Sequence, residues 1–468
     1  MTFQLEKRKI IDNNSVINTD SFDRRHYQSL VESSKELKSI SKKQIVPYFN
    51  DLIGDVWASL YKFSPQIQED VSEKLVGNKR MIENVMNDEL YEEIRPSTKM
   101  DSLMSALTSI RFSEKISDWI DIQNNSNEEF QEKRQALDDA KNSKGRGKKQ
   151  RIEQAEQDLQ QVIKQSIEKQ GAYISQLLND SYSSAKDTKE KVEDLMAGNG
   201  RSDLKKVPFK DQIHLAELLN KNTKLKEIAE WAGRFKSIAR KKQKSKHQEA
   251  LARTGVVVGN EIKRLLPSEL LLYNYSGTRL DFLRRFAEEQ TLMFDQKGKE
   301  SLGQGAIVCC LDQSGSMKNL DTQSKGFALA LMMIAKRQKR DFVLITFSSS
   351  IRKYEFPKGK YTNEQLVEVA SAFLDGGTNF VNPLDEAIKV IQKEKAFKKA
   401  DIVFITDGDA RVLEEFQNRF KKIKKELDFK LLTLLIKTHK ESVLEPLSDK
   451  CVKITDFNDE KAFAAFEI

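Results

Sequence analysis

The stretch that decides the fold of the C-terminal part of the chain is AIVCCLDQSGS, residues 306–316. Its first six residues are apolar, and an apolar run of that length is typical of a buried β-strand. Asp312, Ser314 and Ser316 follow at once, so one carboxylate and two hydroxyls come directly after the strand. In open α/β sheets, ligands bind at the carboxyl ends of the strands. We therefore expect a ligand site that begins at Asp312.

Two further polar segments complete this expected site. The first is GGT at 376–378, and the second is Asp407, which follows another apolar run, IVFIT at 402–406. Carboxylate and hydroxyl oxygens suit Mg²⁺, with Mn²⁺ or Ca²⁺ as alternatives, rather than zinc or copper. Because hydroxyls are neutral, such an ion keeps much of its charge and leaves a position for a partner's carboxylate. The predicted ligands are Asp312, Ser314, Ser316, Thr378 and Asp407.

Strands and helices are expected to alternate from Gly305 to the end of the chain. The apolar runs predict strands at 306–311, 342–347, 351–356, 401–406, 431–436 and 452–455. Between them, the spacing predicts helices at 322–338, 363–373, 383–395 and 412–427, with a last helix from about 459. This alternation is typical of a doubly wound, mostly parallel sheet covered by helices. We therefore expect an α/β domain over residues 305–468.

DQSGS and ITDG each follow or end a predicted strand, and GGT lies between them in the sequence. In this order, the three pieces resemble the metal-ion-dependent adhesion site of the von Willebrand factor A family. The resemblance covers roughly residues 305–468. It implies that Ser314, Ser316 and Thr378 are direct or near-direct ligands of the ion. It also implies that Asp312 and Asp407 bind the ion directly or through water.

Residues 1–295 are expected to form a mostly helical region, because glycine is sparse and apolar residues recur at helical spacing. At 127–170 the composition shifts to charged residues and glutamine, around a glycine-containing turn at 142–149. Two helices with one narrow apolar seam each are typical of an antiparallel coiled-coil arm. The alternative is a helix pair packed on the rest of the region. We place the linker to the α/β domain at about 295–304.

Composition excludes a membrane-embedded protein, since 32% of the 468 residues are charged and no apolar run approaches the roughly 20 residues that span a bilayer. The first residues, MTFQLEKR, lack the apolar core of a signal peptide. The three cysteines, Cys309, Cys310 and Cys451, include no Cys-x-x-Cys pair, and we expect them to be small buried side chains. These observations predict a cytoplasmic protein.

The net charge of +8 permits contact with nucleic acid, anionic lipid or an acidic protein. Basic residues gather at 234–246, RFKSIARKKQKSK, where a phosphate or anionic-lipid contact competes with an ordinary solvated helix face. Nucleic acid is not favoured, because Phe235 is the only aromatic residue available there for base stacking. A lipid contact would place the protein peripherally at the inner face of the membrane.

A closer resemblance concerns the layout, in which a long helical region precedes a C-terminal A domain. LLPSEL at 265–270, the predicted helix at 282–292 and GFALALM at 326–332 resemble segments of the ViaA group of cytoplasmic bacterial A-domain proteins. The resemblance implies a MoxR-type AAA+ ATPase as partner. Two features depart from that group: the charged insertion at 127–170 has no counterpart in it, and ITDG at 405–408 follows the general A-domain form.

These expectations combine into a non-enzymatic, Mg²⁺-dependent adaptor that binds an acidic residue of a protein client and works with the ATPase in protein remodelling or complex maturation. One alternative is a metal-chelatase-like subunit for metal insertion. Another is a Mg²⁺-dependent phosphohydrolase, for which the sequence offers no evident nucleophile or phosphate clamp. There is no Gly-x-x-x-x-Gly-Lys-Ser/Thr loop either, so we do not expect the chain to hydrolyse ATP itself.

Overall fold

A computed structural model of the chain describes residues 14–42, 45–145, 147–196, 204, 207–250, 255–295, 305–393, 400–408, 410–437 and 442–467. The chain divides into two compact units between Lys226 and Glu227. This division groups residues by their contacts, so the predicted domain limits of 1–295 and 305–468 stay a prediction. Among the described residues, no helix is long and apolar enough to cross a membrane.

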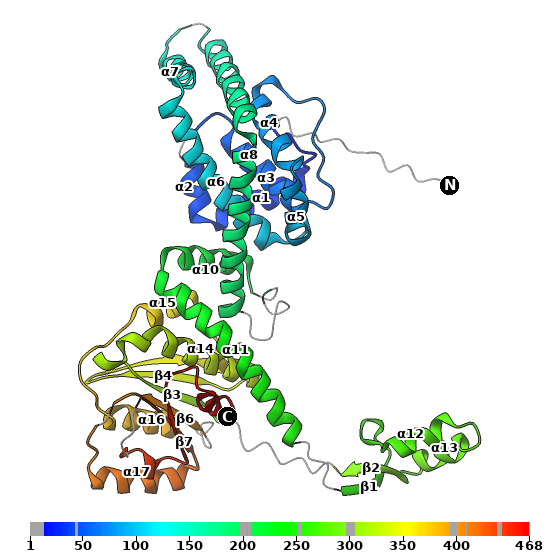
Figure 1. The fold of residues 1–468 in the computed structure, drawn as a ribbon, viewed down its shortest axis with the longest axis vertical. Helices are drawn as coiled ribbons and strands as arrows, with labels where there is room; N and C mark the ends of the chain where they lie inside the picture. The colour runs from blue at the N-terminus through cyan, green and yellow to red at the C-terminus, as the bar shows by residue number, and fades with distance from the viewer. Residues whose placement is uncertain are drawn as a thin grey trace. The chain divides into compact units, whose positions relative to one another are not determined.

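The first unit is helical, as the sequence predicts (Figure 1). Its core contains large side chains that are almost completely buried, among them Trp57, Phe112, Trp119 and Phe130. The helices of this unit are α1 (Ser21–Ser33), α2 (Lys35–Lys42), α3 (Phe49–Tyr61), α4 (Val76–Met86), α5 (Glu89–Thr98), α6 (Ser102–Ser126), α7 (Glu128–Asn142), α8 (Lys148–Met196) and α10 (Phe209–Lys221).

The charged insertion corresponds to α7 and the first half of α8, and it packs on the other helices of its unit. Gln160 on α8 accepts a hydrogen bond of 3.0 Å from the Gly77 amide and donates one of 3.0 Å to the Pro47 carbonyl. A Cβ at Gly77 would lie 2.6 Å from Gln160 Oε1, so this close approach requires glycine. The Tyr48 hydroxyl donates to Glu156 over 3.0 Å. These contacts favour the packed helix pair over a projecting arm.

The C-terminal unit contains the predicted α/β domain, built on one six-stranded sheet of order β5-β4-β3-β6-β7-β8. Four neighbouring strand pairs are parallel, and β4 with β5 is antiparallel. The central strands are buried along their whole length, as expected when helices cover both faces. The strands are β3 (Ile307–Asp312), β4 (Phe342–Phe347), β5 (Ile351–Phe356), β6 (Asp401–Thr406), β7 (Lys430–Ile436) and β8 (Lys450–Ile454).

Helices cover the two faces of this sheet. Figure 1 shows α14 (Asp321–Gln338) on one face and α16 (Val381–Lys393) with α17 (Glu414–Leu427) on the other. Alternate residues of the strands, such as Val308 and Phe404, form one apolar cluster with Leu384 of α16 and Phe420 of α17. The doubly wound, mostly parallel fold predicted from the sequence is therefore confirmed. The remaining helix, α15 (Asn363–Ser371), precedes the Gly-Gly-Thr segment.

The basic segment at 234–246 lies on α11 (Thr223–Ala250), and its apolar side packs on α14. Phe235 lies 5.3 Å from Phe327, measured between ring centroids, and both side chains are completely buried. A Cβ at Gly326 would lie 2.5 Å from the Cβ of Trp231, which explains the glycine in GFALALM. The segment is thus a helix with one packed face, and lipid contact by its basic residues stays a prediction.

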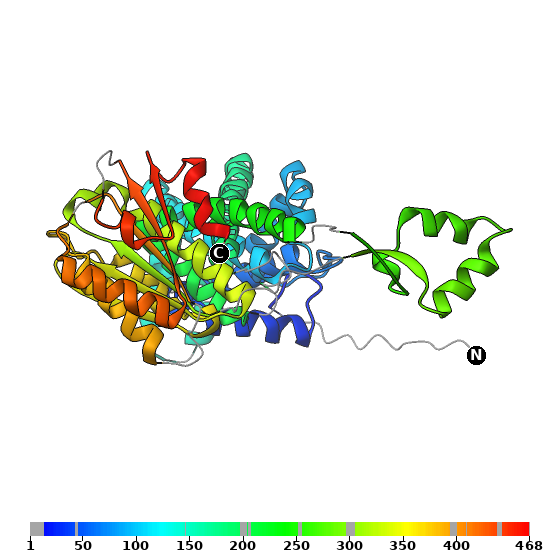
Figure 2. The same cartoon turned by 90° about the horizontal axis from the view of Figure 1, so that it is seen from below.

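Residues 255–295 form a small module of two helices on a two-stranded antiparallel sheet (Figure 2). Its elements are β1 (Gly255–Gly259), α12 (Pro267–Asn274), α13 (Arg279–Ala287) and β2 (Thr291–Asp295). The predicted helix at 282–292 is wrong in its last part, because α13 ends at Ala287 and Leu292 belongs to β2. Glu289 has a positive φ of 56°, which ends the helical conformation. The expected linker continues past Asp295 outside the described residues.

Candidate metal site

The sheet brings the first and last pieces of the predicted site together. Strands β3 and β6 are parallel neighbours, with Leu311 paired to Ile405, so Asp312 and Thr406 come next to each other at the carboxyl edge. Ser314 and Ser316 follow β3, and Asp407 follows β6. The Gly-Gly-Thr segment lies in the loop after α15. The Gly376 carbonyl of this loop accepts a hydrogen bond of 3.0 Å from the Gly315 amide.

Two pairs of oxygen atoms in the site are separated by distances close to those between neighbouring ligands of one cation. Ser314 Oγ is 3.1 Å from Ser316 Oγ, and Ser316 Oγ donates a hydrogen bond of 2.7 Å to Asp407 Oδ1. Adjacent ligands of an octahedral Mg²⁺ ion, bound at 2.0–2.1 Å, are about 2.9 Å apart. The two hydroxyls and the carboxylate therefore fit a hard divalent ion in both chemistry and separation.

Asp312 supports the site from its buried side. Its side chain has no exposed surface; Oδ1 accepts a hydrogen bond of 2.8 Å from the Ser314 amide, and Oδ2 accepts one from the Thr406 hydroxyl. Burial raises the pKa of Asp312, against the lowering effect of the Thr406 and Ser314 hydrogen bonds. Since both oxygens already have a donor, a water-bridged role is the simplest way for Asp312 to act on an ion.

Thr378 lies beside the other end of the site. A Cβ on Gly408 would be 3.2 Å from Thr378 Oγ1, so the hydroxyl rests against the residue that follows Asp407. The structure thus joins Asp312, Ser314, Ser316 and Asp407 in one chain of hydrogen bonds and places Thr378 next to its end. Their role as metal ligands stays a prediction. Asp409, a further acid of the same loop, lies outside the described residues.

Two residues near the site were missed by the sequence analysis. Thr406 supports Asp312 and also accepts a hydrogen bond of 3.0 Å from the Gly408 amide. Asp375 has a positive φ of 56° and carries its carboxylate over Gly315, where a Cβ would lie 3.1 Å from Asp375 Oδ1. The signal for Asp375 was its place directly before the Gly-Gly-Thr segment. It adds an exposed carboxylate close to Gly315, between the two serines.

A buried network connects the loop that carries Ser314 and Ser316 with the loop that carries Thr378. Lys325 on α14 has no exposed surface; its Nζ donates to Asp321 over 2.8 Å and to the Ala372 carbonyl over 2.6 Å. Gln313, which stands between Asp312 and Ser314, donates to the same Ala372 carbonyl over 3.4 Å. The loop that carries the serines and the loop that carries Thr378 therefore share one acceptor and one buried ion pair.

The cysteines take no part in this site. Cys309 and Cys310 are completely buried within β3, Cys451 is half-buried on β8, and none of the three forms a disulfide. Burial raises the pKa of each thiol. Among the residues that the structure describes, no group of three or more His, Cys, Asp or Glu side chains is arranged for a metal.

Comparison with known proteins agrees with the fold and the motifs. Residues 307–409 match the von Willebrand factor type A domain family. The chain is 30% identical over 462 residues to the uncharacterized protein MJ0811 of Methanocaldococcus jannaschii, covering 96% of this chain and 98% of that protein. It is also 30% identical over 232 residues to the regulatory protein ViaA of Photorhabdus laumondii, covering 43% of this chain and 47% of ViaA. The chain belongs to the von Willebrand A-domain proteins of the ViaA group.

Solved structures with the same type of domain include von Willebrand factor type A from Catenulispora acidiphila. It is 16% identical, with a TM-score of 0.28, over 35% of this chain and 42% of that one. The SpRpn10 VWA domain is 17% identical, with a TM-score of 0.27, over 32% of this chain and 87% of that one. Von Willebrand A domains often bind a divalent metal ion, and the oxygens of Ser314, Ser316 and Asp407 are the atoms suited to one here.

Proposed function

We propose that this von Willebrand A-domain protein is a non-enzymatic adaptor, whose A domain holds Mg²⁺ and thereby binds an acidic side chain of a partner protein. The observation that carries the proposal is the spacing of Ser314 Oγ, Ser316 Oγ and Asp407 Oδ1, at 3.1 and 2.7 Å. A bound Mg²⁺ supplies a positive charge at the exposed carboxyl edge of the sheet. Ser314 and Ser316 hold the ion without neutralising it, because their hydroxyls are uncharged.

The positions of the carboxylates support recognition rather than catalysis. Asp312 is buried, and its two oxygens are engaged by the Ser314 amide and the Thr406 hydroxyl, so it is poorly placed to attack a phosphate. Lys325, a cation close to the loops, is fully buried and paired with Asp321, so it cannot clamp a phosphate at the surface. Lys318 is exposed two residues after Ser316, so the case against a phosphohydrolase lies in the buried Asp312.

The partner that we propose is a MoxR-type AAA+ ATPase, with the adaptor presenting a protein client in remodelling or complex maturation. Support comes from membership of the ViaA group and from the regulatory role that the name of the Photorhabdus protein states. In this proposal the A domain grips an acidic residue of one party, and the helical unit binds the other. A metal-chelatase-like subunit is the second candidate, since the same metal site would serve it.

Metal binding and partner binding can be tested separately. Titration calorimetry with Mg²⁺ and Mn²⁺ measures the first, in wild type and in the Ser314→Ala/Ser316→Ala variant. Ser371→Ala is the matched control, because its hydroxyl is exposed and donates only to carbonyls of its own helix, α15. We expect saturable binding in wild type and the control, and its loss in the double variant. Equal binding in all three proteins would contradict the metal assignment.

Partner binding is tested by affinity capture from native lysate with Mg²⁺, and in parallel with EDTA. An AAA+ ATPase retained by wild type and by Ser371→Ala, and lost with EDTA and in the double serine variant, is the expected result. An ATPase retained in all four conditions would move its interface away from the metal. Recovery of a cofactor-loaded enzyme with no ATPase would favour the chelatase-like alternative instead.

A further inference from the structure

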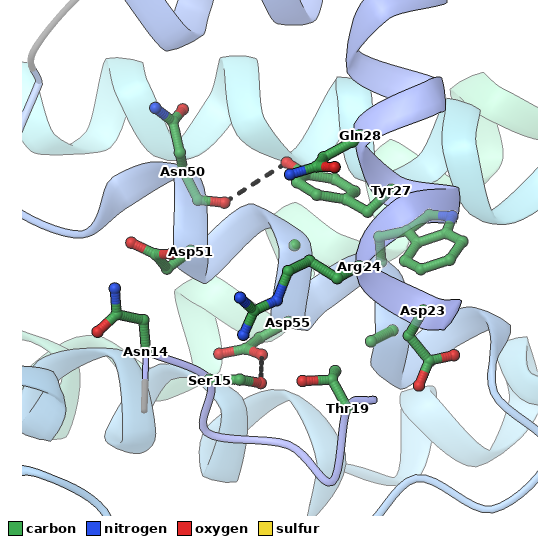
Figure 3. Close-up of a pocket in the computed structure, with 13 residues that line it drawn as sticks. Asn14, Ser15, Thr19, Asp23, Arg24, Tyr27, Gln28, Asn50, Asp51 and Asp55 are labelled. Atoms are coloured by element: carbon green, nitrogen blue, oxygen red, sulfur yellow. Dashed lines mark hydrogen bonds between the residues drawn. The ribbon is translucent and has the colours of Figure 1, made fainter. Parts of the chain in front are cut away.

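A cavity of about 310 Å³ lies in the helical unit, far along the sequence from the metal site. Its wall is made by residues of the segment 14–19 and by helices α1 and α3 (Figure 3). The residues that line it recur at helical spacing on α1 and α3, so one face of each helix borders the space. Those that matter for its chemistry are Asn14, Thr19, Arg24, Tyr27, Asp51 and Asp55.

Asp55 is the buried acid of this cavity. Its side chain is 2% exposed and accepts hydrogen bonds from the Ser15 hydroxyl and, over 2.9 Å, from the Val16 amide. Both donors are neutral. Burial, with a smaller contribution from the nearby Asp51, raises the pKa of Asp55 to about 7. A buried carboxyl normally pairs with a cation or stays protonated, and among the described residues Asp55 forms no ion pair that would hold its charge at neutral pH.

The other charged groups of the cavity largely balance one another. Asp51 stands one helical turn before Asp55, and the positive charge of Arg24 on α1 acts on it, partly offsetting the rise in its pKa that burial causes. Asp23 forms an ion pair with Lys62. Tyr27 is neutral, because burial and the two carboxyls raise its pKa. The charge left without a counterpart is that of Asp55.

The uncharged part of the wall also favours a ligand. The hydroxyl of Thr19 is buried and has no hydrogen-bond partner, although it borders the space beside Asp55 (Figure 3). The Tyr27 ring packs against the α3 backbone at Gly54, where a Cβ would lie 3.1 Å away. Trp57 lines the space as well. Aromatic rings beside a carboxylate attract organic cations.

We propose that this cavity binds a small ligand through an alkylammonium group, with Asp55 as its counter-ion and the Thr19 hydroxyl as a hydrogen-bond acceptor. An ammonium group fits better than a metal ion, since the described residues of the wall hold no group of three acids arranged for a metal. Three N–H donors can be shared between a carboxylate and a hydroxyl. The inference concerns the helical unit and is independent of the metal site.

Calorimetric titration of the full chain with butylamine at pH 8 is the first test, with butanol as the uncharged probe of equal length. We expect saturable binding of butylamine alone at pH 8 and, at pH 6 in buffers of different ionisation enthalpy, release of protons on binding. Protons are released because the alkylamine stays charged, with a pKa near that of lysine at about 10.4, while Asp55 must ionise to receive it. Binding is therefore expected to weaken as the pH falls from 8 to 6.

Asp55→Asn decides whether the charge is responsible. The amide oxygen can still accept from either Ser15 or Val16, so one bond to this segment stays while the charge and the other bond are lost. We expect binding of butylamine to fall by about ten- to a hundredfold in this variant, as for loss of a charged hydrogen bond. Asp121→Asn, an exposed acid on α6 outside the cavity, is the matched control and is expected to bind as wild type does.

A further arm distinguishes a free amine from a lysine side chain. Nα-acetyl-lysine amide presents the same ammonium group on a peptide backbone. If it binds as butylamine does, the cavity accepts a lysine of a protein; if only butylamine binds, the ligand is a free small amine. The proposal is overturned if butanol binds equally well, if Asp55→Asn binds unchanged while folded by circular dichroism, or if wild type shows no saturable binding up to about 10 mM.

Discussion

Ser316 Oγ donates a hydrogen bond of 2.7 Å to Asp407 Oδ1, across 91 residues of sequence. The bond joins the loop after β3 to the end of β6, and it ties together two of the pieces on which the metal assignment depends. Each piece is weak evidence alone, since serines and aspartates are common in turns. In the fold, the three motifs lie together at one edge of a parallel sheet, although they are far apart in the sequence.

Removal of one serine hydroxyl is expected to weaken the metal site without unfolding the domain. Ser316 is exposed, so Ser316→Ala leaves the core untouched but deletes a proposed ligand and the bond to Asp407. We expect Mg²⁺ affinity to fall by about tenfold, as for loss of an interaction of about 1.5 kcal/mol. Calorimetry measures it, with Ser371→Ala as the control. Unchanged affinity would remove Ser316 from the ligand set.

Thr406→Val tests the support beneath Asp312. Valine keeps the shape of threonine but leaves Asp312 Oδ2 and the Gly408 amide without the Thr406 hydroxyl. Because Asp312 is completely buried, we expect the free energy of unfolding to fall by about 1–3 kcal/mol. Urea unfolding followed by circular dichroism measures this change. An unfolding midpoint equal to that of wild type would show that the hydroxyl is dispensable.

Lys325 and Asp321 should be strongly coupled in stability. Lys325→Met leaves the Asp321 carboxylate buried without its cation, and such a loss costs about 3–5 kcal/mol. We expect the double variant Asp321→Asn/Lys325→Met to be more stable than Lys325→Met alone, because no charge is then stranded. Thermal unfolding of wild type, the single variants Asp321→Asn and Lys325→Met, and the double variant completes the cycle. Additive effects would mean that the ion pair contributes nothing of its own.

The raised pKa of Asp55 predicts a specific dependence of stability on pH. The folded value of about 7 lies above the unfolded value of about 3.9, so the folded state holds the proton more tightly. The stabilising contribution is complete below the unfolded pKa and is lost as the pH rises through about 7. Asp55→Asn should therefore raise the unfolding temperature relative to wild type more at pH 8 than at pH 5. A constant difference across this range would exclude a raised pKa.

Gly326→Ala should disturb the packing of α11 on α14. A Cβ at this position would lie 2.5 Å from the Cβ of Trp231 and 3.1 Å from the Ala232 amide nitrogen, so a helix backbone would have to move. Overpacking of this kind costs about 1–3 kcal/mol. Gly277→Ala is a milder comparison, because the nearest atom there is 3.4 Å away on the Tyr275 ring. Equal unfolding midpoints in the two variants would contradict the close contact.

The sequence was most informative where period and position agreed. The apolar runs at 342–347 and 401–406 became β4 and β6 with the predicted bounds, because a strand buried on both faces has a simple pattern. Asp312 and Asp407 were placed at one edge of the sheet by the same pattern, since each stands at or directly after the end of such a strand. Thr406 could not be recognised as functional, because it is the last residue of an apolar run and its role depends on the neighbouring strand.

Elsewhere the sequence left two structures open or pointed to the wrong one. A narrow apolar seam at 127–170 suits a coiled-coil arm and a packed pair equally, and the contact of Gly77 with Gln160 is visible only in three dimensions. Five residues, GVVVG at 255–259, are too few to establish a strand without their partner at 291–295. In the sequence, Asp55 is one polar residue of an amphipathic helix. Its burial depends on the segment at Ser15 and Val16, which lies 39–40 residues away and donates hydrogen bonds to it.

Because Lys325 is buried, its rate of chemical labelling depends on how often the surrounding loops open. Its amino group has no exposed surface and is held by Asp321 and by the carbonyls of Ala370 and Ala372, so an acylating reagent cannot reach it while these loops are closed. Exposed lysines on the same domain, such as Lys318, react without any such opening. The ratio of the two labelling rates, measured by mass spectrometry, would report how often the loops around Lys325 open.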